Sequence, residues 1–291
     1  MTARGAATAI VMSTLLGAAN VAAQDVDLAA ARASLRAADA AHAAAVEARG
    51  IVDGLPAAFA SDVYFLRDGA DVLHGLEAVR ADLAASPLAG ARVSWATLRA
   101  DVSADGTRGY TFGGGAYTAA DGRQHFSRTL AFWRNEGGTW KVAAFLVNAA
   151  PDAPQAAPAG FFREEPVRGA AGVDEVMRAD RDFAAQAGVS GVAGAFRDWM
   201  APDGAMLSGP IYGPEALFAV MNGGRATLEW GPIAGDIAGS GDLGFTIGVA
   251  TRTAETGARN YSKYLTIWRR QPGGAWRFVV DAGTVRPAPA A

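Results

Sequence analysis

The sequence has 291 residues, which suits two domains of ordinary size. Hydrophobic residues make up 51% and charged residues 19%, so the chain is globular rather than disordered. The formal net charge of −3 argues against a nucleic-acid-binding protein, which would carry a basic stripe. The absence of cysteine excludes thiol nucleophiles, disulfides and cysteine-ligated metal sites.

Residues 1–23 are predicted to be a secretory signal peptide. Arg4 supplies a positive start, a mostly apolar run covers residues 6–19, and Val21 and Ala23 stand where a signal peptidase reads small side chains. The alternative is an uncleaved anchor, but the run is shorter than the ~20 residues of a membrane span. We therefore expect a soluble mature chain from near Gln24 that is periplasmic or secreted, with no membrane span after cleavage.

Residues 24–150 are predicted to form a first α+β domain. Helices are expected over 28–50, 50–60 and 75–86, with a hairpin over 62–75 around an Asp-Gly turn. Four strands are then expected over 92–105, 108–119, 123–135 and 139–148, joined by turns rich in Asp and Gly. This order predicts three helices packed on one face of a curved antiparallel sheet.

Residues 151–171 form a Pro/Ala-rich, semi-stiff linker in which Phe161 and Phe162 are expected to hold the segment against a domain. Residues 172–291 repeat the order of the first domain. Helices are expected over 173–188, 190–201 and 213–224, and four strands follow between 226 and 283.

The two halves are copies of one domain. The stretch TLAFWRNEGGTWKVAAFLVN at 129–148 matches YLTIWRRQPGGAWRFVVDAG at 264–283, and Trp268 follows Trp133 by 135 positions. The same spacing relates Trp95 to Trp230, and it grows to 141 for Asp39 and Asp180. An ordered series of matches with growing loop insertions indicates an internal duplication.

The motifs also point to a family. G-x-E-A opens the third helix of each copy at residues 75–78 and 213–216, and W-R/K pairs flank a glycine turn in each final hairpin. The chain thereby resembles the nuclear transport factor 2-like superfamily, and within it the SnoaL-like and ketosteroid-isomerase-like group of largely unassigned function. The resemblance covers nearly all of the mature chain and implies two cone-shaped domains. Since this fold hosts isomerases, cyclases and binding modules, it does not identify the function.

An isomerase of this kind needs a carboxylate base and hydrogen-bond donors in an apolar pocket. The catalytic candidates in the second domain are Asp281, Tyr264 and Asp182. Strand alternation places Asp281 on the same face as Arg277, which also suggests an ordinary surface ion pair. Tyr261 and Tyr264 are three residues apart, so at most one of them can line the pocket. Asp39 and Asp180, which recur on the first helix, are interpreted as ion-paired or solvated.

Further residues are candidates for lining a ligand pocket, namely His42, Tyr64, Phe183, Tyr212 and Trp230. In the first domain, Phe145 occupies the position of Asp281, and Thr129 that of Tyr264. The chain's three histidines fit no ligand-spacing motif, so neither a metal nor another cofactor is expected.

These features favour an exported tandem protein that binds a small apolar or amphipathic organic molecule in a conical pocket. The alternatives are a ketosteroid-isomerase-like or polyketide-cyclase-like enzyme acting through the second domain, and a structural interaction module of the cell envelope. An inward carboxylate with an inward donor would favour the enzyme, a wholly apolar cavity would favour binding, and a filled cone would favour a structural role.

The two sheets are also expected to meet in an intramolecular pseudo-dimer. Each sheet has one face covered by helices, and the other face is too apolar to be left in water. Two rows compete for that outer face, one containing Ser127, Thr129 and Tyr264, and the other containing Phe132 and Ile267. The alternative is two independent domains on a flexible linker.

Overall fold

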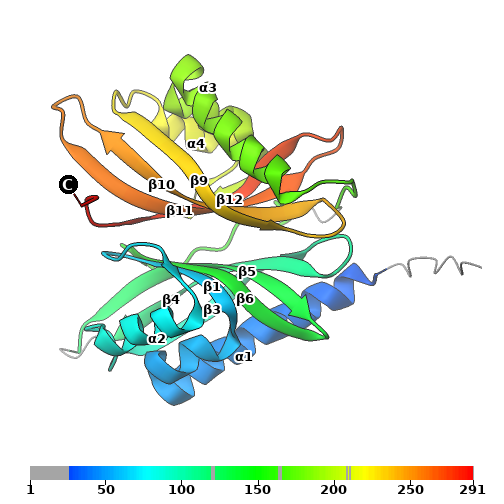
Figure 1. Cartoon of the computed structure of the whole chain (residues 1–291), viewed down its shortest axis with the longest axis vertical. Coiled ribbons are helices and arrows are strands. Elements are labelled where there is room, and N and C mark those ends of the chain that lie inside the picture. Colours follow the sequence, from blue (N-terminus) through cyan, green and yellow to red (C-terminus); the bar gives the residue numbers. More distant parts are fainter. Residues whose placement is uncertain (1–25, 119–121, 163–165, 208, 210, 291) are drawn as a thin grey trace, which may run out of the picture.

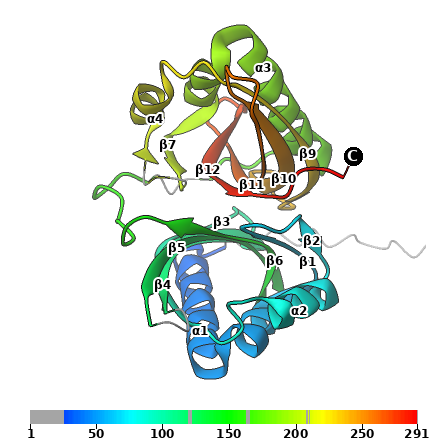
Figure 2. The ribbon, with the colours of Figure 1, turned by 90° about the vertical axis from the view of Figure 1, so that its left-hand side faces the viewer.

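The structure is a computed structural model that describes residues 26–118, 122–162, 166–207, 209 and 211–290. The predicted signal peptide lies outside these residues. The described chain contains two six-stranded sheets that face each other, and the helices of each domain cover the face of its sheet that is turned away from the other domain (Figures 1 and 2). None of the described helices is long and apolar enough to cross a membrane.

The described part of the first domain contains two helices, one 3-10 turn and six strands. In chain order they are α1 (Leu28–Gly54), the 3-10 turn η1 (Leu55–Ala58), β1 (Phe59–Arg67), β2 (Leu73–His74), α2 (Leu76–Ala85), β3 (Arg92–Val102), β4 (Arg108–Thr118), β5 (Gln124–Glu136) and β6 (Thr139–Ala150).

The second domain repeats this order after the linker. Its elements are α3 (Val173–Trp199), β7 (Met200–Met206), β8 (Ile211–Tyr212), α4 (Pro214–Met221), β9 (Thr227–Ile237), β10 (Leu243–Thr253), β11 (Arg259–Arg270) and β12 (Trp276–Val285).

The described helices number four, not three in each domain as predicted. The predicted first and second helices of each copy form one element with a kink, at Gly50 in α1 and at Gly191 in α3. Their φ angles are 76° and 74°, a left-handed conformation that glycine adopts without the steric penalty of a Cβ. The glycines therefore bend the chain where a stop was expected.

The sheets are mixed, which corrects the expectation of purely antiparallel sheets. Their strand orders are β2-β1-β6-β5-β4-β3 and β8-β7-β12-β11-β10-β9. β1 pairs with β6 in parallel, and β7 pairs with β12 in parallel, while the remaining pairs are antiparallel. The cause is topological, because the last strand of each meander returns beside the first strand of its domain, β1 or β7, and runs in the same direction.

Each sheet has an inner face that packs against its own helix and an outer face that packs against the other domain. The inner faces carry Trp133 and Trp268, which are fully buried in separate apolar clusters. One further cluster joins the outer faces, and in it the rings of Phe132 and Phe245 lie 4.8 Å apart. The outer row is thus the one containing Phe132 and Ile267, and the Ser127, Thr129 and Tyr264 row points into the cones.

Polar contacts at the end of the interface follow the duplication. The backbone N–H of Ser240 donates to the carboxylate of Asp105 at 2.8 Å, and that of Ala104 donates to the carboxylate of Asp242 at 2.9 Å. Each domain thereby supplies a carboxylate to a turn of the other. In the linker, Phe162 contacts Phe112 of the first domain, as well as Tyr212 of the second.

Candidate functional site

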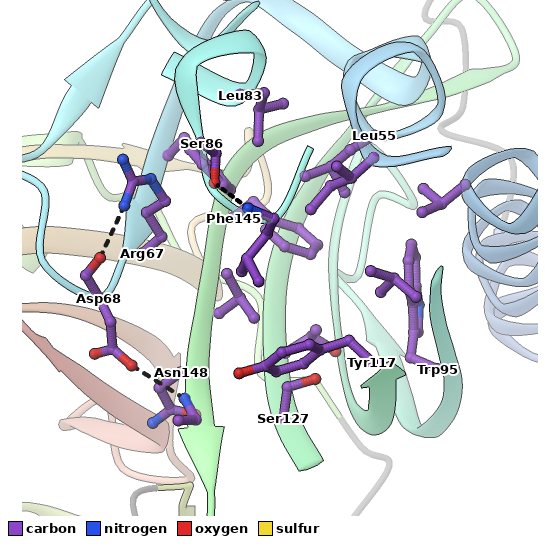
Figure 3. A pocket seen from close by; sticks show the side chains of 18 residues that line it. Leu55, Arg67, Asp68, Leu83, Ser86, Trp95, Tyr117, Ser127, Phe145 and Asn148 are labelled. Carbon is purple, nitrogen blue, oxygen red and sulfur yellow. Dashed lines mark hydrogen bonds between the residues drawn. The ribbon is translucent and has the colours of Figure 1, made fainter. Parts of the chain in front are cut away.

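The first domain encloses a cavity of about 170 Å³ between its sheet and its helices (Figure 3). Residues from α1, η1, β1, α2 and strands β3 to β6 line it, together with the loop after α2. Strand alternation explains the lining, because alternate residues on β5 and β6 face the helices. Ser127 and Thr129 on β5, and Phe145 and Val147 on β6, all line the cavity.

The inner part of this cavity is apolar and aromatic. Trp95, Phe145 and Leu55 form walls there, and no carboxylate or ammonium group lies among them. The charged side chains lie at the rim, where Arg67 ends strand β1 and Asp68 begins the following turn (Figure 3). Such a cavity can hold an apolar body while polar groups at its rim meet a polar end.

The rim side chains are held by hydrogen bonds. The guanidinium of Arg67 donates through Nε and Nη2 to the two carboxylate oxygens of Asp82 on α2, at 2.6 and 2.5 Å. The carboxylate of Asp68 accepts from the backbone N–H of Ala149 at 3.2 Å. A planar guanidinium that makes two parallel hydrogen bonds fixes geometry as well as charge.

The second domain has a smaller cavity of about 140 Å³ in the same position. It differs from the first because a buried carboxyl group, that of Asp281, faces it. Residues that line it are Phe183, Phe196, Met206, Leu228, Trp230, Ala250, Ser262, Tyr264, Thr266, Asp281 and Gly283.

Asp281 faces this cavity and is almost fully buried. Its carboxylate accepts a hydrogen bond from the hydroxyl of Thr266 on the neighbouring strand at 2.5 Å. Burial raises the pKa of Asp281 to about 7, the hydroxyl of Thr266 acts in the opposite direction, and the nearby charge of Asp180 adds to the increase. The carboxyl group is therefore poised between its neutral and charged forms near neutral pH.

The predicted orientation of Asp281 beside Arg277 was wrong because β12 contains a bulge. Ile267 pairs with Val280, but the next residue of β11, Trp268, pairs with Phe278, so Val279 is an extra residue. One extra residue inverts the alternation of faces along the strand. Asp281 consequently shares the inner face with Phe278.

Asp180 on α3 is a functional candidate that the sequence interpretation missed. It is 1% exposed, and its carboxylate accepts hydrogen bonds from Nε1 of Trp230 at 3.1 Å and from the hydroxyl of Tyr264 at 3.0 Å. Burial raises the pKa of Asp180, and burial together with the Asp180 charge raises the pKa of Tyr264. By contrast, Asp182 is exposed and does not line the cavity.

The first domain contains the equivalent of this buried carboxylate. Asp39 is 3% exposed and accepts hydrogen bonds from Nε1 of Trp95 at 3.4 Å and from the hydroxyl of Thr97 at 2.5 Å. The interpretation of both helix aspartates as solvated or ion-paired was therefore wrong. Their recurrence together with Trp95 and Trp230 was the signal that could have identified a buried pair.

The predicted pocket residues fall into two groups. Phe183 and Trp230 line the second cavity, and Tyr264 does so whereas Tyr261 does not. Tyr64 and Tyr212 do not line either cone and pack instead against the apolar cluster between the sheets. Tyr64 stacks on His74, and the hydroxyl of Tyr212 donates to the carbonyl of Gln155 in the linker.

His42 does not line the first cavity but lies behind its wall, and it lines a separate, more open pocket between α1, η1 and the β5–β6 turn. It is 3% exposed, its Nε2 lies 2.8 Å from the carbonyl oxygen of Leu55, and its ring contacts Trp95 and Phe145 edge to face. Burial lowers the pKa of His42 to about 4, so the ring is neutral near pH 7. A neutral ring that packs on the cavity wall is suited to support the wall. Among the described residues, no group of three or more His, Asp or Glu side chains could hold a metal ion.

No protein-family model matches the chain, and no curated protein matches it. Solved structures do resemble parts of it. A ketosteroid isomerase-like protein from Erwinia carotovora atroseptica is 15% identical over 42% of this chain and 97% of its own length, with a TM-score of 0.36. An NTF2-like protein of unknown function from Pseudomonas putida is 20% identical over 43% of this chain and 89% of its own, with a TM-score of 0.35. An NTF2-like protein with a cystatin-like fold from Novosphingobium aromaticivorans is 19% identical over 40% and 83%, with a TM-score of 0.33.

The raised pKa of Asp281 predicts a pH-dependent contribution to stability. The folded chain retains a proton at pH values where an unfolded carboxyl group, with a pKa of about 4, has lost it. This contribution is complete below pH ~4 and is lost as the pH rises through about 7. The side chain of the Asp281→Asn variant stays neutral at every pH. The free energy of unfolding of the variant minus that of the wild type should therefore increase by on the order of 3 kcal/mol from pH 4 to pH 8.

Urea unfolding of both proteins across this pH range measures the difference. Comparing the two proteins cancels the contributions of titrating groups that do not interact with Asp281, such as Asp39. Parallel stability curves would show that Asp281 titrates normally in the folded chain.

Proposed function

We propose that the chain binds a small organic molecule with an apolar body, and that the first-domain cavity is the principal site. The observation that carries this proposal is a cavity of about 170 Å³ with aromatic inner walls and with its charged side chains at the rim. An apolar protein cavity of about 150 Å³ accommodates benzene, although cavities for drug-sized ligands are larger. The occupant is therefore a molecule built around one small ring or a short branched chain, with any polar group directed to the rim.

The duplication offers matched variants to test this binding. Val93 lines the first cavity from a partly exposed position on β3, and Leu228 stands at the equivalent place in the second cavity. A 19F NMR titration with fluorobenzene measures occupancy. We expect fluorobenzene to bind more tightly in the first cavity than in the second. Val93→Trp should fill the first cavity and abolish the tighter binding, whereas Leu228→Trp should leave the tighter binding unchanged. Binding that survives Val93→Trp, or a wild type that shows none, would contradict the proposal.

A second candidate function, general acid–base catalysis in the second domain, is favoured by one specific observation. Asp281 projects into the cavity with a pKa of about 7, the value that suits proton transfer at neutral pH. Ser262 and Thr266 bring hydroxyl groups to the same cavity, and the Thr266 hydroxyl already binds Asp281. In this proposal Asp281 removes a proton from carbon beside a carbonyl group, as in the isomerases that the sequence motifs resemble.

Deuterium exchange at the α-carbons of cyclohexanone, followed by NMR in D2O, tests this candidate directly. The base must be ionised, so the catalysed rate should rise as the pH passes about 7. Asp281→Asn should lower the rate by about 100-fold or more. The matched control is Asp182→Asn, because Asp182 is exposed on α3 and should not affect the rate. Equal rates for wild type and Asp281→Asn would remove the catalytic proposal.

We further propose that the chain is exported, with cleavage after Ala23, and acts in the periplasm or outside the cell. The charged start and apolar run of residues 1–23 support this proposal. N-terminal sequencing of the protein recovered from its native envelope should begin near Gln24, and an intact Met1 would contradict it.

We also propose that the chain is a monomer in solution, an intramolecular pseudo-dimer in which the second domain takes the place of a partner subunit. The apolar cluster that includes Phe132 and Phe245 supports this, since it already covers the outer face of each sheet. A duplicated domain on a short linker meets its partner at high effective concentration.

A further inference from the structure

Lys263 is a fully buried cation on β11 that reaches across the domain interface. Its ammonium group donates three hydrogen bonds to backbone carbonyl groups. Two acceptors belong to the first domain, Arg67 and Ala70, each at 2.6 Å, and the third is Val285 of the second domain at 2.8 Å. All three N–H donors of the ammonium group are therefore used.

Those two carbonyl groups belong to the turn between β1 and β2, which forms part of the first-domain cavity. Arg67 and Asp68 line that cavity at its rim. The side chain of Arg67 binds Asp82 on α2, while its carbonyl group binds Lys263. The same residue is thus fixed from one side by its own domain and from the other side by the second domain.

The end of β12 adds further contacts to this turn. The backbone N–H of Gly69 donates to the carbonyl of Val285 at 3.1 Å. Asp68 accepts from the hydroxyl of Thr284 and from the N–H of Val285, and Arg286 donates to Asp71 at 3.0 Å. The turn on the cavity rim is therefore attached largely to the other domain.

We propose that Lys263 is a positioning residue for the first-domain binding site, because it holds the β1–β2 turn in the conformation that shapes the cavity rim. The inference rests on the binding function proposed above for that cavity. The second domain is then part of the binding apparatus, not only a cover for an apolar sheet. Since coupling between two events is reciprocal, a ligand in the cavity should also strengthen the attachment of the turn.

The chemistry of lysine suits this role. A compact ammonium group can satisfy three converging carbonyl groups, whereas the planar guanidinium of arginine directs its donors in a fixed fork. Burial lowers the pKa of Lys263 to about 8, and the charges of Asp68 and Asp71 oppose that decrease, so the group stays charged at neutral pH. The equivalent residue of the first domain is Arg128, which binds Asp152 in the linker. The contact of one buried ammonium group with three carbonyl groups therefore occurs at Lys263 and not at the equivalent position of the first domain.

The chain contains only two lysines, so Lys141→Met is a matched control for Lys263→Met. Both changes are made in the Leu228→Trp background, where only the first cavity is open to fluorobenzene. Lys263→Met should raise the dissociation constant of fluorobenzene about fivefold or more, and Lys141→Met should not change it.

Hydrogen exchange of the Gly69 amide gives a second measurement that needs no ligand. Lys263→Met should speed this exchange about tenfold or more while the amide of Ile247, in the core of β10, exchanges as before. Unchanged affinity together with unchanged Gly69 exchange would overturn the inference, and so would equal acceleration at Ile247, which would indicate a loss of overall stability. If the Leu228→Trp protein binds no fluorobenzene, the proposed function fails, and Gly69 exchange still decides whether Lys263 positions the rim.

Discussion

The outer face of each sheet carries large apolar side chains that water solvates poorly, and each sheet buries that face against the other. The rings of Phe132 of the first domain and Phe245 of the second are in contact, within a cluster that contains residues of both sheets. Burial of apolar area is the main favourable contribution to such an association. Because the outer faces are used in this way, each helical side remains free to enclose a cavity.

The same backbone arrangement carries two different interiors. At equivalent places, the first domain has Phe145 and Thr129 where the second has Asp281 and Tyr264. The aromatic ring extends an apolar wall, whereas the carboxylate brings a titratable group into a small cavity. Both domains nevertheless keep one hydrogen bond from a tryptophan to a buried aspartate, Trp95 to Asp39 in the first and Trp230 to Asp180 in the second. The two cavities therefore share this hydrogen-bonded pair but differ in other residues that line them.

Much of the fold could be predicted from the sequence because the repeat showed its boundaries twice. The hairpins, the helix at each G-x-E-A motif and the α+β class follow from local patterns. The orientation of Asp281 could not be predicted, since a single extra residue at Val279 inverts the strand alternation and leaves no clear mark in the sequence. The burial of Asp180 and the exposure of Asp182 could not be predicted, because on a helix only tertiary packing shows which of two neighbouring aspartates is buried. Tyr64 and Tyr212 were misplaced for a similar reason, because both lie on strands whose outer face meets the other domain.

The burial of one sheet by the other is tested most directly by producing residues 26–160 and 166–290 as separate chains and measuring their masses by sedimentation, alone and mixed. If the outer faces need each other, each half alone should self-associate or unfold, and the mixture should form a one-to-one complex that unfolds cooperatively. Two halves that remain monomeric when mixed, each as stable alone as within the whole chain, would contradict the account.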